Sequence, residues 1–274
     1  IAQIAQQLGN DAEFEAHFNR CVELIPGDQW VLDEQRLREE EKDPAGAIAK
    51  REQQLAETPD DAENIRRLAV LSEKIGDFDK AESYMLKLRA LQPEEENLVA
   101  VLSSLYHRAG RPEKSLEVLQ AHVDSKADPD DKSKAMIWIA AHYMKVGDPG
   151  MMERTLLQAA DISKTFEVCR ALGDFYMRAG APARALSWFD EAINRGRLTK
   201  NPQLPAVYTS RIICLLSPGL ADIASARQRV EEFRRTYPQD VRGLYFEAEI
   251  AANDGDIEKA VEALTRYLEV RPSN

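Results

Sequence analysis

Apolar residues recur at helical spacing in one segment of the chain after another. Segments that precede a glycine include Ile65, Leu68, Ala69 and Leu71, and later Leu172, Gly173, Phe175 and Tyr176. Segments that follow a glycine include Ala81, Met85 and Leu88, and later Ala185, Phe189, Ala192 and Ile193. Apolar residues three and four positions apart are typical of amphipathic α-helices. The pattern therefore predicts units of helix, tight turn and helix.

These units repeat about every 34 residues. Residues 62–95 and 241–274 both carry a glycine near the middle, an alanine five residues later and a proline near the end. The mid-unit glycines are Gly9, Gly76, Gly110, Gly147, Gly180 and Gly255, and the closing prolines are Pro26, Pro59, Pro93, Pro238 and Pro272. A period of this length indicates stacked copies of one supersecondary unit.

The residue types in each unit fit a tight pair of helices. Glycine tolerates the left-handed conformation that ends a helix, and the aspartate that follows, as in Asp77, Asp148 and Asp256, can cap the next helix. Small residues recur where the two helices would cross. They are Ala69, Ser103, Ala140, Gly173 and Ala248 on first helices, and Ala47, Ala81, Ser115, Ala185, Ala226 and Ala260 on second helices. Helices approach closely only where such positions stay small.

The chain resembles the tetratricopeptide repeat family, whose pattern is Leu-Gly-x-x-Tyr followed by Gly, Ala, an aromatic residue, Ala and Pro. Residues 166–199 match it with Leu172, Gly173, Tyr176, Gly180, Ala185, Phe189 and Ala192. Residues 62–95 match with Leu68, Ala69, Gly76, Ala81, Met85 and Pro93, and residues 241–274 with Leu244, Ala248, Gly255, Ala260, Leu264 and Pro272. The resemblance implies an all-α fold, a right-handed superhelical solenoid of antiparallel helix pairs.

The resemblance covers the whole chain, which we expect to be a single solenoid of about seven and a half repeats. The repeats are 1–27 (partial), 28–61, 62–95, 96–132, 133–165, 166–199, 200–240 and 241–274. The chain opens on IAQIAQQLGN, which is typical of the tail of a helix, and ends at Asn274 without a polar capping helix. Because terminal repeats normally need such a cap, we expect a fragment of a longer array.

Several repeats depart from the pattern. The turn at 41–44 has no glycine, Arg51 and Gln54 replace apolar residues, and Met152 stands where a small residue is expected. Residues 199–206 add about seven positions, and Ser217-Pro218-Gly219 replaces the usual turn. These departures predict an irregular loop and a local change of superhelical pitch at 199–206.

Composition narrows the class of partner. The formal net charge is −11 with a pI of about 5.0, whereas nucleic-acid binding depends on clustered Lys and Arg. We therefore expect no nucleic-acid partner, and an RNA-binding solenoid is the least favoured alternative. No segment of the sequence approaches the ~20 apolar residues of a membrane span. Cys21, Cys169 and Cys214 occupy apolar positions of the repeat, which predicts buried free thiols and favours a reducing, cytoplasmic compartment.

No pattern of residues indicates catalysis, a cofactor or a metal. His17 and Cys21 stand four residues apart on one helix, but a zinc site needs three or four ligands. The acidic runs 39–41 and 94–96 are interpreted as solvated surface. No phosphate-binding loop or nucleophile motif is present. The aromatic residues Phe18, Phe189 and Tyr267 are predicted to lie in the core. We expect a protein that is not an enzyme.

In the tetratricopeptide repeat family, the first helices line a concave groove that holds a partner segment. Carried onto this chain, the inward positions are Arg66, Arg67, Val70, Val101, Ser104, His107, Arg108, Ile137, Trp138, Ala141, Met144, Lys145, Arg170, Asp174, Met177 and Arg178. The last repeat adds Arg242, Tyr245, Phe246 and Glu249. The central residues are apolar and arginines lie along the same surface, which suits a ligand with apolar anchors and acidic groups. A Trp138 that packs into a neighbouring helix is the alternative interpretation.

Members of the family that bind chaperone tails hold a carboxylate with Lys, Asn and Arg at set positions. Here the two Asn positions are Val70 and Val101, and the final Arg position is Trp138. The carboxylate clamp is absent, which disfavours that partner class.

The leading hypothesis is a non-catalytic protein–protein interaction scaffold that binds a peptide or partner segment in its concave groove. One alternative is a regulatory or sensory repeat array of a larger enzyme or membrane-associated protein. A second alternative is a module that self-associates through its uncapped ends.

Overall fold

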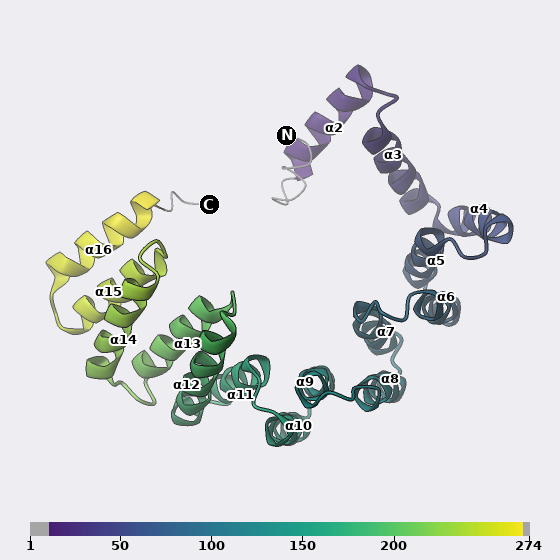
Figure 1. Cartoon of the computed structure of the whole chain (residues 1–274). Helices are drawn as coiled ribbons and strands as arrows, with labels where there is room; N and C mark the ends of the chain where they lie inside the picture. Colours follow the sequence, from purple (N-terminus) through teal and green to yellow (C-terminus); the bar gives the residue numbers. More distant parts are fainter. Residues whose placement is uncertain (1–10, 271–274) are drawn as a thin grey trace. The chain divides into compact units, whose positions relative to one another are not determined.

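The structure, a computed structural model, describes residues 11–270. Within that range the backbone forms fifteen α-helices and no strand (Figure 1). The all-α fold class is therefore confirmed. The chain divides into two compact units, Ile1–Arg111 and Pro112–Asn274, and a single continuous solenoid stays a prediction.

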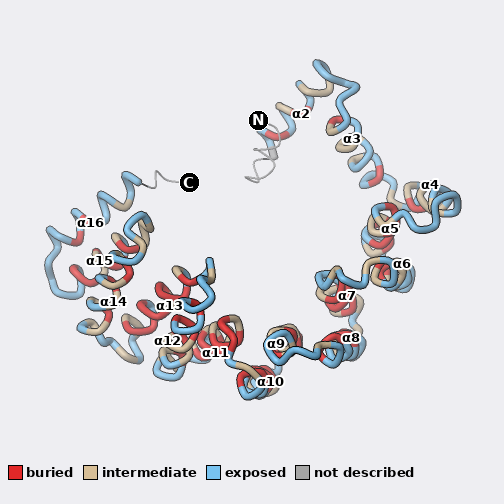
Figure 2. The backbone as a smooth tube through the Cα atoms, in the orientation of Figure 1, coloured by how far each residue is buried: buried red, intermediate tan, exposed pale blue. Residues whose placement is uncertain are grey.

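Each unit is a row of helices in which sequence neighbours pack together. The first unit contains α2 (Asp11–Leu24), α3 (Gln29–Lys42), α4 (Pro44–Glu57), α5 (Ala62–Lys74), α6 (Phe78–Leu91) and α7 (Asn97–Arg108). The second contains α8 (Pro112–Asp124), α9 (Pro129–Val146), α10 (Pro149–Ile162), α11 (Phe166–Arg178), α12 (Pro182–Thr199), α13 (Leu204–Leu216), α14 (Ile223–Thr236), α15 (Arg242–Asn253) and α16 (Ile257–Val270). Figure 2 shows the buried residues concentrated on the sides where neighbouring helices of a unit meet.

The turns within the repeats have the geometry that the sequence predicts. Gly76, Gly110, Gly147, Gly180 and Gly255 all adopt positive φ, between 69° and 80°. The aspartates that follow three of them, Asp77, Asp148 and Asp256, each accept a hydrogen bond from a backbone N–H three residues later, at 3.1, 2.9 and 3.1 Å. These bonds satisfy donors that the start of a helix otherwise leaves free.

The turn between α3 and α4, which has no glycine, has a different structure. Asp43 is the only residue between α3 and α4, and its carboxylate accepts a 3.0 Å bond from the backbone N–H of Gly46. Pro44 follows as the first residue of α4, where a missing N–H costs nothing. One aspartate and one proline therefore replace the Gly-Asp turn.

Most of the small residues at the helix crossings are buried as expected. They are Ala69, Ser103, Ala140 and Ala248 on first helices, and Ala81, Ser115, Ala185, Ala226 and Ala260 on second helices, each at most 7% exposed. A Cβ added at Gly173 of α11 would lie only 2.4 Å from the Phe189 ring of α12. The exception is Ala47 of α4, which is half-buried and borders a cleft.

The irregular loop predicted at 199–206 is limited to residues 200–203, and the other half of the segment is helix. α12 continues to Thr199 and spans 18 residues, and α13 already begins at Leu204. Only residues 200–203 lie between the two helices, with Lys200 in the left-handed conformation. Gly196, in the last turn of α12, leaves room for the side chains of Leu204 and Phe166, since a Cβ there would lie 2.8 Å from each of them.

Two predictions of burial are wrong. Tyr267 is half-buried rather than in the core, and its ring lies 6.0 Å from that of Tyr245 of α15. Cys21 is half-exposed, whereas Cys169 and Cys214 are fully buried, and all three thiols are free. Burial raises the pKa of the Cys169 thiol to about 12 and that of Cys214 to about 11, so these two act as small apolar side chains.

The predictions that concern Gly9, Pro272, Asn274 and the opening segment fall outside the described residues.

Candidate partner-binding surface

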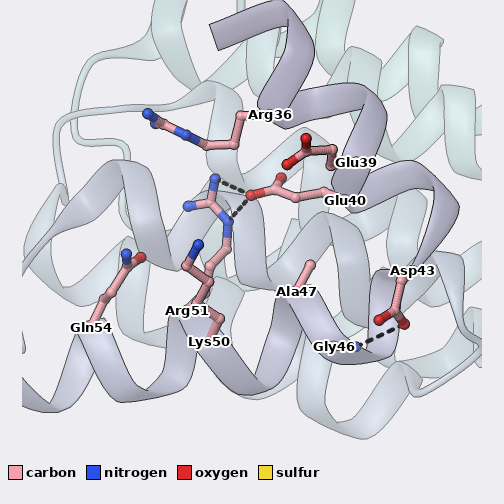
Figure 3. Close-up of a pocket in the computed structure, with 9 residues that line it drawn as sticks. All are labelled: Arg36, Glu39, Glu40, Asp43, Gly46, Ala47, Lys50, Arg51 and Gln54. Carbon is pink, nitrogen blue, oxygen red and sulfur yellow. Dashed lines mark hydrogen bonds and ion pairs between the residues drawn. The ribbon is translucent and has the colours of Figure 1, made fainter. Parts of the chain in front are cut away.

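A polar cleft of about 470 Å³ lies between α3 and α4 in the first unit (Figure 3). Its walls carry both signs of charge: Arg36, Lys50 and Arg51 oppose Glu39, Glu40 and Asp43. Asp43 caps α4, and Glu40 is held by arginines, so most of these charges are already paired inside the chain. The cleft therefore shows no clear preference for an anion or a cation.

Glu40 corrects the interpretation of residues 39–41 as solvated surface. Its carboxylate is only 9% exposed and accepts two 2.6 Å hydrogen bonds, one from Arg51 Nε of α4 and one from Arg67 Nε of α5. Arg51 Nη1 also donates to Asn64 Oδ1 at 3.0 Å. Arginines from two helices bury this one carboxylate because Arg51 stands at a position that other repeats fill with an apolar residue. Glu39 and Glu41 are exposed as expected.

The predicted groove residues of the first unit lie on α5 and α7, and their arginines are all ion-paired within the chain. Arg66 pairs with Glu95 at 2.9 Å, Arg67 with Glu40, and Arg108 with Glu73. Val70 and Val101 are exposed at 49% and 44%, and Ser104 and His107 are half-buried. These arginines are thus paired with glutamates of the same unit. The strip of unpaired positive charge that the sequence predicts on this surface is therefore reduced.

In the second unit, Trp138 of α9 is half-buried against α8. Its ring is stacked on that of His122, with centroids 4.9 Å apart and planes 7° apart. His122 is itself buried, at 6% exposed. Ile137 packs against the core of this unit, and Ala141 is half-buried. Part of the Trp138 ring therefore has a structural role within the helix pair.

A smaller, apolar cleft of about 240 Å³ lies in the second unit between α9, α10 and α11. Met144, Met152 and Phe175 supply its apolar walls, and Arg178 stands at its edge. Met144 is 49% exposed, while Met152 and Phe175 are buried. Two residues predicted for the groove, Met144 and Arg178, lie more than 30 positions apart in the sequence and are brought into one cleft by α9 and α11.

Helix α11, which contributes Arg178 to that cleft, carries further charged residues. Arg170, Asp174 and Arg178 stand four residues apart, on one side of the helix. Burial raises the pKa of the Asp174 carboxyl, and the charges of Arg170 and Arg178 oppose the rise. Arg170 Nε is buried without a hydrogen-bond partner. Lys145 of α9 is exposed, and Met177 is half-buried with its sulfur 2.9 Å from Cys214 Sγ.

Sequence reasoning missed two wall residues of the apolar cleft, Met152 and Phe175. Phe175 belongs to the apolar pattern that indicates a core, and Met152 differs from the pattern only as a large residue at a position where a small one is expected. Met152 is the one sequence feature that could have indicated the cleft, because a long flexible side chain at a helix crossing changes the space beside it.

Among the described residues, no group of three or more His, Cys, Asp and Glu side chains is arranged to hold a metal ion. His17 lies 3.8 Å from Glu13 on its own helix. Within residues 11–270, no helix combines the length and apolar character needed to cross a lipid bilayer.

Comparison with known families decides what the repeats are. Two sequence profiles, both described as tetratricopeptide repeat, match the chain: one at residues 66–132 and 219–274, the other at 1–28. Together they cover more than half of the chain. The chain is a tetratricopeptide repeat protein. Its fold belongs to a class that generally mediates protein–protein interaction and whose members are mostly non-catalytic scaffolds. No curated protein matches the sequence.

Solved structures share the tetratricopeptide fold at low identity. The C-terminal part of a TPR repeat-containing protein from Cytophaga hutchinsonii is 16% identical, with a TM-score of 0.53 over 84% of this chain and 91% of that one. BtubC from P. vanneervenii is 17% identical, with a TM-score of 0.51 over 81% and 91%. PilW, described as a type IV pilus biogenesis factor, is 14% identical, with a TM-score of 0.50 over 78% and 94%. Identities this low support the fold alone.

Proposed function

We propose that this tetratricopeptide repeat protein is a non-catalytic scaffold whose second unit binds a segment of a partner protein along α9 and α11. The observation that carries the proposal is the apolar cleft of Met144, Met152 and Phe175, which is open to solvent and has Arg178 at its edge. Methionine and aromatic side chains are enriched at the cores of protein interfaces. The family-wide role in protein interaction supports the same function.

The size of the cleft favours one anchoring side chain over a small-molecule ligand. Its volume of about 240 Å³ is below the roughly 300–1,000 Å³ of typical small-molecule pockets. An apolar side chain of the size of leucine, methionine or phenylalanine would bury the exposed face of Met144. The flexible walls formed by Met144 and Met152 can adjust to more than one such anchor.

The charges of α11 favour an acidic group beside the anchor. Two arginines and one aspartate lie in a row there, and burial raises the pKa of the Asp174 carboxyl while the two arginines oppose that rise. A partner carboxylate near Arg178 or Arg170 would gain charge-assisted hydrogen bonds. The proposed ligand is therefore a peptide segment with one large apolar residue flanked by Asp or Glu. The exposed part of Trp138 would extend the apolar surface along α9.

The test is fluorescence polarisation with a set of labelled nine-residue peptides that each carry one Met, Leu or Phe among Asp and Glu residues. We expect Met144→Glu and Arg178→Glu each to weaken binding at least tenfold, since the first places a charge in the cleft and the second removes the complementary one. Val146→Glu is the matched control, because Val146 is an exposed apolar residue of α9 outside the cleft. Circular dichroism should be unchanged in all three variants.

Equal affinities of Met144→Glu and Val146→Glu for the peptides would contradict the proposal, as would the absence of binding by every peptide in the set. Trp138→Ala is a poorer test, because loss of the stack on buried His122 would also lower stability.

A further inference from the structure

Helices α14, α15 and α16 of the second unit, which follow one another in Figure 1, line a cleft of about 270 Å³. Its floor is apolar, since Val230, Ile250 and Ala251 are 3%, 4% and 3% exposed. Its rim is charged and consists of Arg227, Glu231, Arg234, Glu247 and Lys259. None of these eight lining residues is aromatic. An apolar floor with a few polar groups around it is typical of a binding site.

The internal repeat shows which side chain stands at this place elsewhere in the chain. Four residues before the turn glycine, the first helices α7, α9 and α11 each carry a tyrosine: Tyr106, Tyr143 and Tyr176. Helix α5 has Ser72 at that position, which is fully buried, and α15 has Ala251. The cleft thus lies beside a position where three other repeats supply an aromatic ring.

Two of these tyrosines are held in the same way. The hydroxyl of Tyr176 donates a 2.7 Å hydrogen bond to Glu153 of α10, and the guanidinium of Arg184 of α12 lies over its ring, 5.4 Å from the centroid. The hydroxyl of Tyr106 donates a 2.9 Å hydrogen bond to Glu82 of α6. In both cases the preceding second helix binds the hydroxyl, and α12 adds a cation above the ring.

The residues that hold the tyrosine of α11 have counterparts that line the cleft. Counted from the residue that precedes each second helix, Glu153 corresponds to Arg227 of α14, and Arg184 corresponds to Lys259 of α16. Both counterparts border the cleft, together with Ala251 at the tyrosine position. The cleft therefore has the surroundings of a tyrosine ring and lacks the ring itself.

The cleft opens on a face that later repeats leave uncovered. Two further repeats follow the equivalent site at α10–α12 within the described chain. The side chains of Arg184 and Glu153 nevertheless remain 68% and 33% exposed there. This face is therefore accessible from solvent inside the array as well, and the cleft does not owe its opening to the place where the sequence ends.

Arg227 favours a ring that carries a hydroxyl. Both of its hydrogen bonds to Asp254 come from Nη2, at 2.8 and 2.6 Å, and a guanidinium has further donors on Nε and Nη1. In the same unit, Arg197 Nε donates a 2.7 Å hydrogen bond to the phenol oxygen of Tyr208. A phenol oxygen can therefore accept from Arg227 at the place where Tyr176 donates to a glutamate.

The charges around the cleft favour a neutral ligand over an anion. Arg227 pairs with Asp254, and Arg234 pairs with Glu247. Glu231 and Lys259 are the other two charged residues of the rim. Positive and negative groups are thus equal in number, and a phosphate or carboxylate would meet carboxylates as well as cations.

We propose that the cleft between α14, α15 and α16 binds the tyrosine side chain of a partner protein, with the ring over Val230 and Ala251 and the hydroxyl at Arg227. Lys259 would lie over the ring, as Arg184 does in the earlier repeat. The volume of about 270 Å³ is below the roughly 300–1,000 Å³ of typical small-molecule pockets, which favours a single side chain. This site is separate from the α9–α11 cleft and does not depend on the function proposed for it.

The experiment follows the methyl NMR signals of Val230 and Ile250 during titration with N-acetyl-tyrosinamide and, separately, N-acetyl-phenylalaninamide. We expect the tyrosine probe to shift both signals to saturation, because an aromatic ring alters the shielding of methyl groups beside it. It should bind roughly threefold or more tightly than the phenylalanine probe, which cannot accept a hydrogen bond from Arg227. Met144→Glu should leave this binding unchanged, which separates the site from the α9–α11 cleft.

Two variants and a control define the site. Ala251→Tyr should abolish binding without lowering the melting temperature, because the chain's own ring then fills the cleft. Ala252→Tyr, at the exposed neighbouring residue, is the matched control and should bind as the wild type does. Arg227→Leu should still bind both probes, but with equal affinity. This variant keeps the test decisive if Ala251→Tyr does not fold.

The proposal is wrong if the tyrosine probe gives no saturable shift, or if the wild type binds both probes equally. Unchanged binding by a folded Ala251→Tyr variant would place the ring elsewhere. Tighter binding of free p-cresol than of N-acetyl-tyrosinamide would assign the cleft to a small phenol instead of a partner's side chain.

Discussion

At the scale of single residues, the second unit contains an arginine buried among carboxylates. Arg211 of α13 is only 5% exposed and pairs with Asp190 of α12 at 3.2 Å and Glu232 of α14 at 2.9 Å. Glu232 also accepts hydrogen bonds from Arg229 and Arg197. Three consecutive helices are therefore joined by one charge network, and a buried charge of this kind is tolerated only while it is paired.

We predict that Glu232→Gln destabilises the second unit by about 1–3 kcal/mol at neutral pH, because Arg211 then keeps only the half-exposed Asp190 as a charged partner. Burial tends to raise the pKa of Glu232, but the charge of Arg211 and hydrogen bonds from Arg211, Arg229 and Arg197 lower it below its ordinary value of 4.5. The ionised group therefore stabilises the fold above about pH 4.5, and this stabilisation is lost as pH falls through the folded-state pKa.

Urea unfolding of the wild type and the variant at neutral pH and below pH 4 measures both effects. The difference between the two proteins should shrink in acid. Exposed Glu231→Gln is the control and should be neutral at both pH values. A pH-independent difference would show that Glu232 acts through packing rather than charge.

At the scale of helices, a tight crossing lies between α11 and α12. Gly173 has no room for a side chain, since a Cβ there would lie 2.4 Å from the buried Phe189 ring. Gly150 in α10 is also helical, but a Cβ there would meet only Asp148 Oδ1, at 3.5 Å. Both glycines are helical, but Gly150 is the second residue of α10, whereas Gly173 lies in the middle of α11 and faces a side chain of another helix.

We predict opposite effects of alanine at these two sites. Gly173→Ala should destabilise the unit by about 1–3 kcal/mol, because overpacking of a tight crossing outweighs the gain in helix propensity. Gly150→Ala should stabilise it by up to about 1 kcal/mol, because only the propensity changes. Thermal unfolding of both variants provides the measurement. Stabilisation by both substitutions would mean that Phe189 can move aside.

Part of the segment that the sequence predicts as an irregular loop, residues 199–206, belongs to helices. The apolar pattern locates α12 and α13 correctly, but residues 199–206 contain two prolines and predict irregular structure. The structure extends α12 to Thr199 because Gly196 lets Leu204 and Phe166 approach its last turns. The deciding contacts come from two other helices, α11 and α13, so a local pattern does not record them.

At the scale of the whole molecule, the dominant property is a net charge of −11. Most arginines described above are paired with carboxylates within the chain, which leaves fewer of them to bind phosphates. We predict no salt-dependent retention of a labelled single-stranded RNA in filter binding between roughly 50 and 200 mM salt, because counterion release requires several unpaired Lys or Arg contacts. Retention that falls steeply with salt would contradict this and restore the RNA-binding alternative.

The sequence by itself determined the repeating helix pairs, the left-handed glycine turns, the aspartate caps and most of the small crossing residues. Each of these depends on neighbours within one or two turns of the chain, which a periodic pattern records. Only the tertiary structure decided that Glu40 is buried between Arg51 and Arg67, and that Met144 and Arg178 share a cleft with Met152 and Phe175. Those outcomes depend on which side chains meet across different helices.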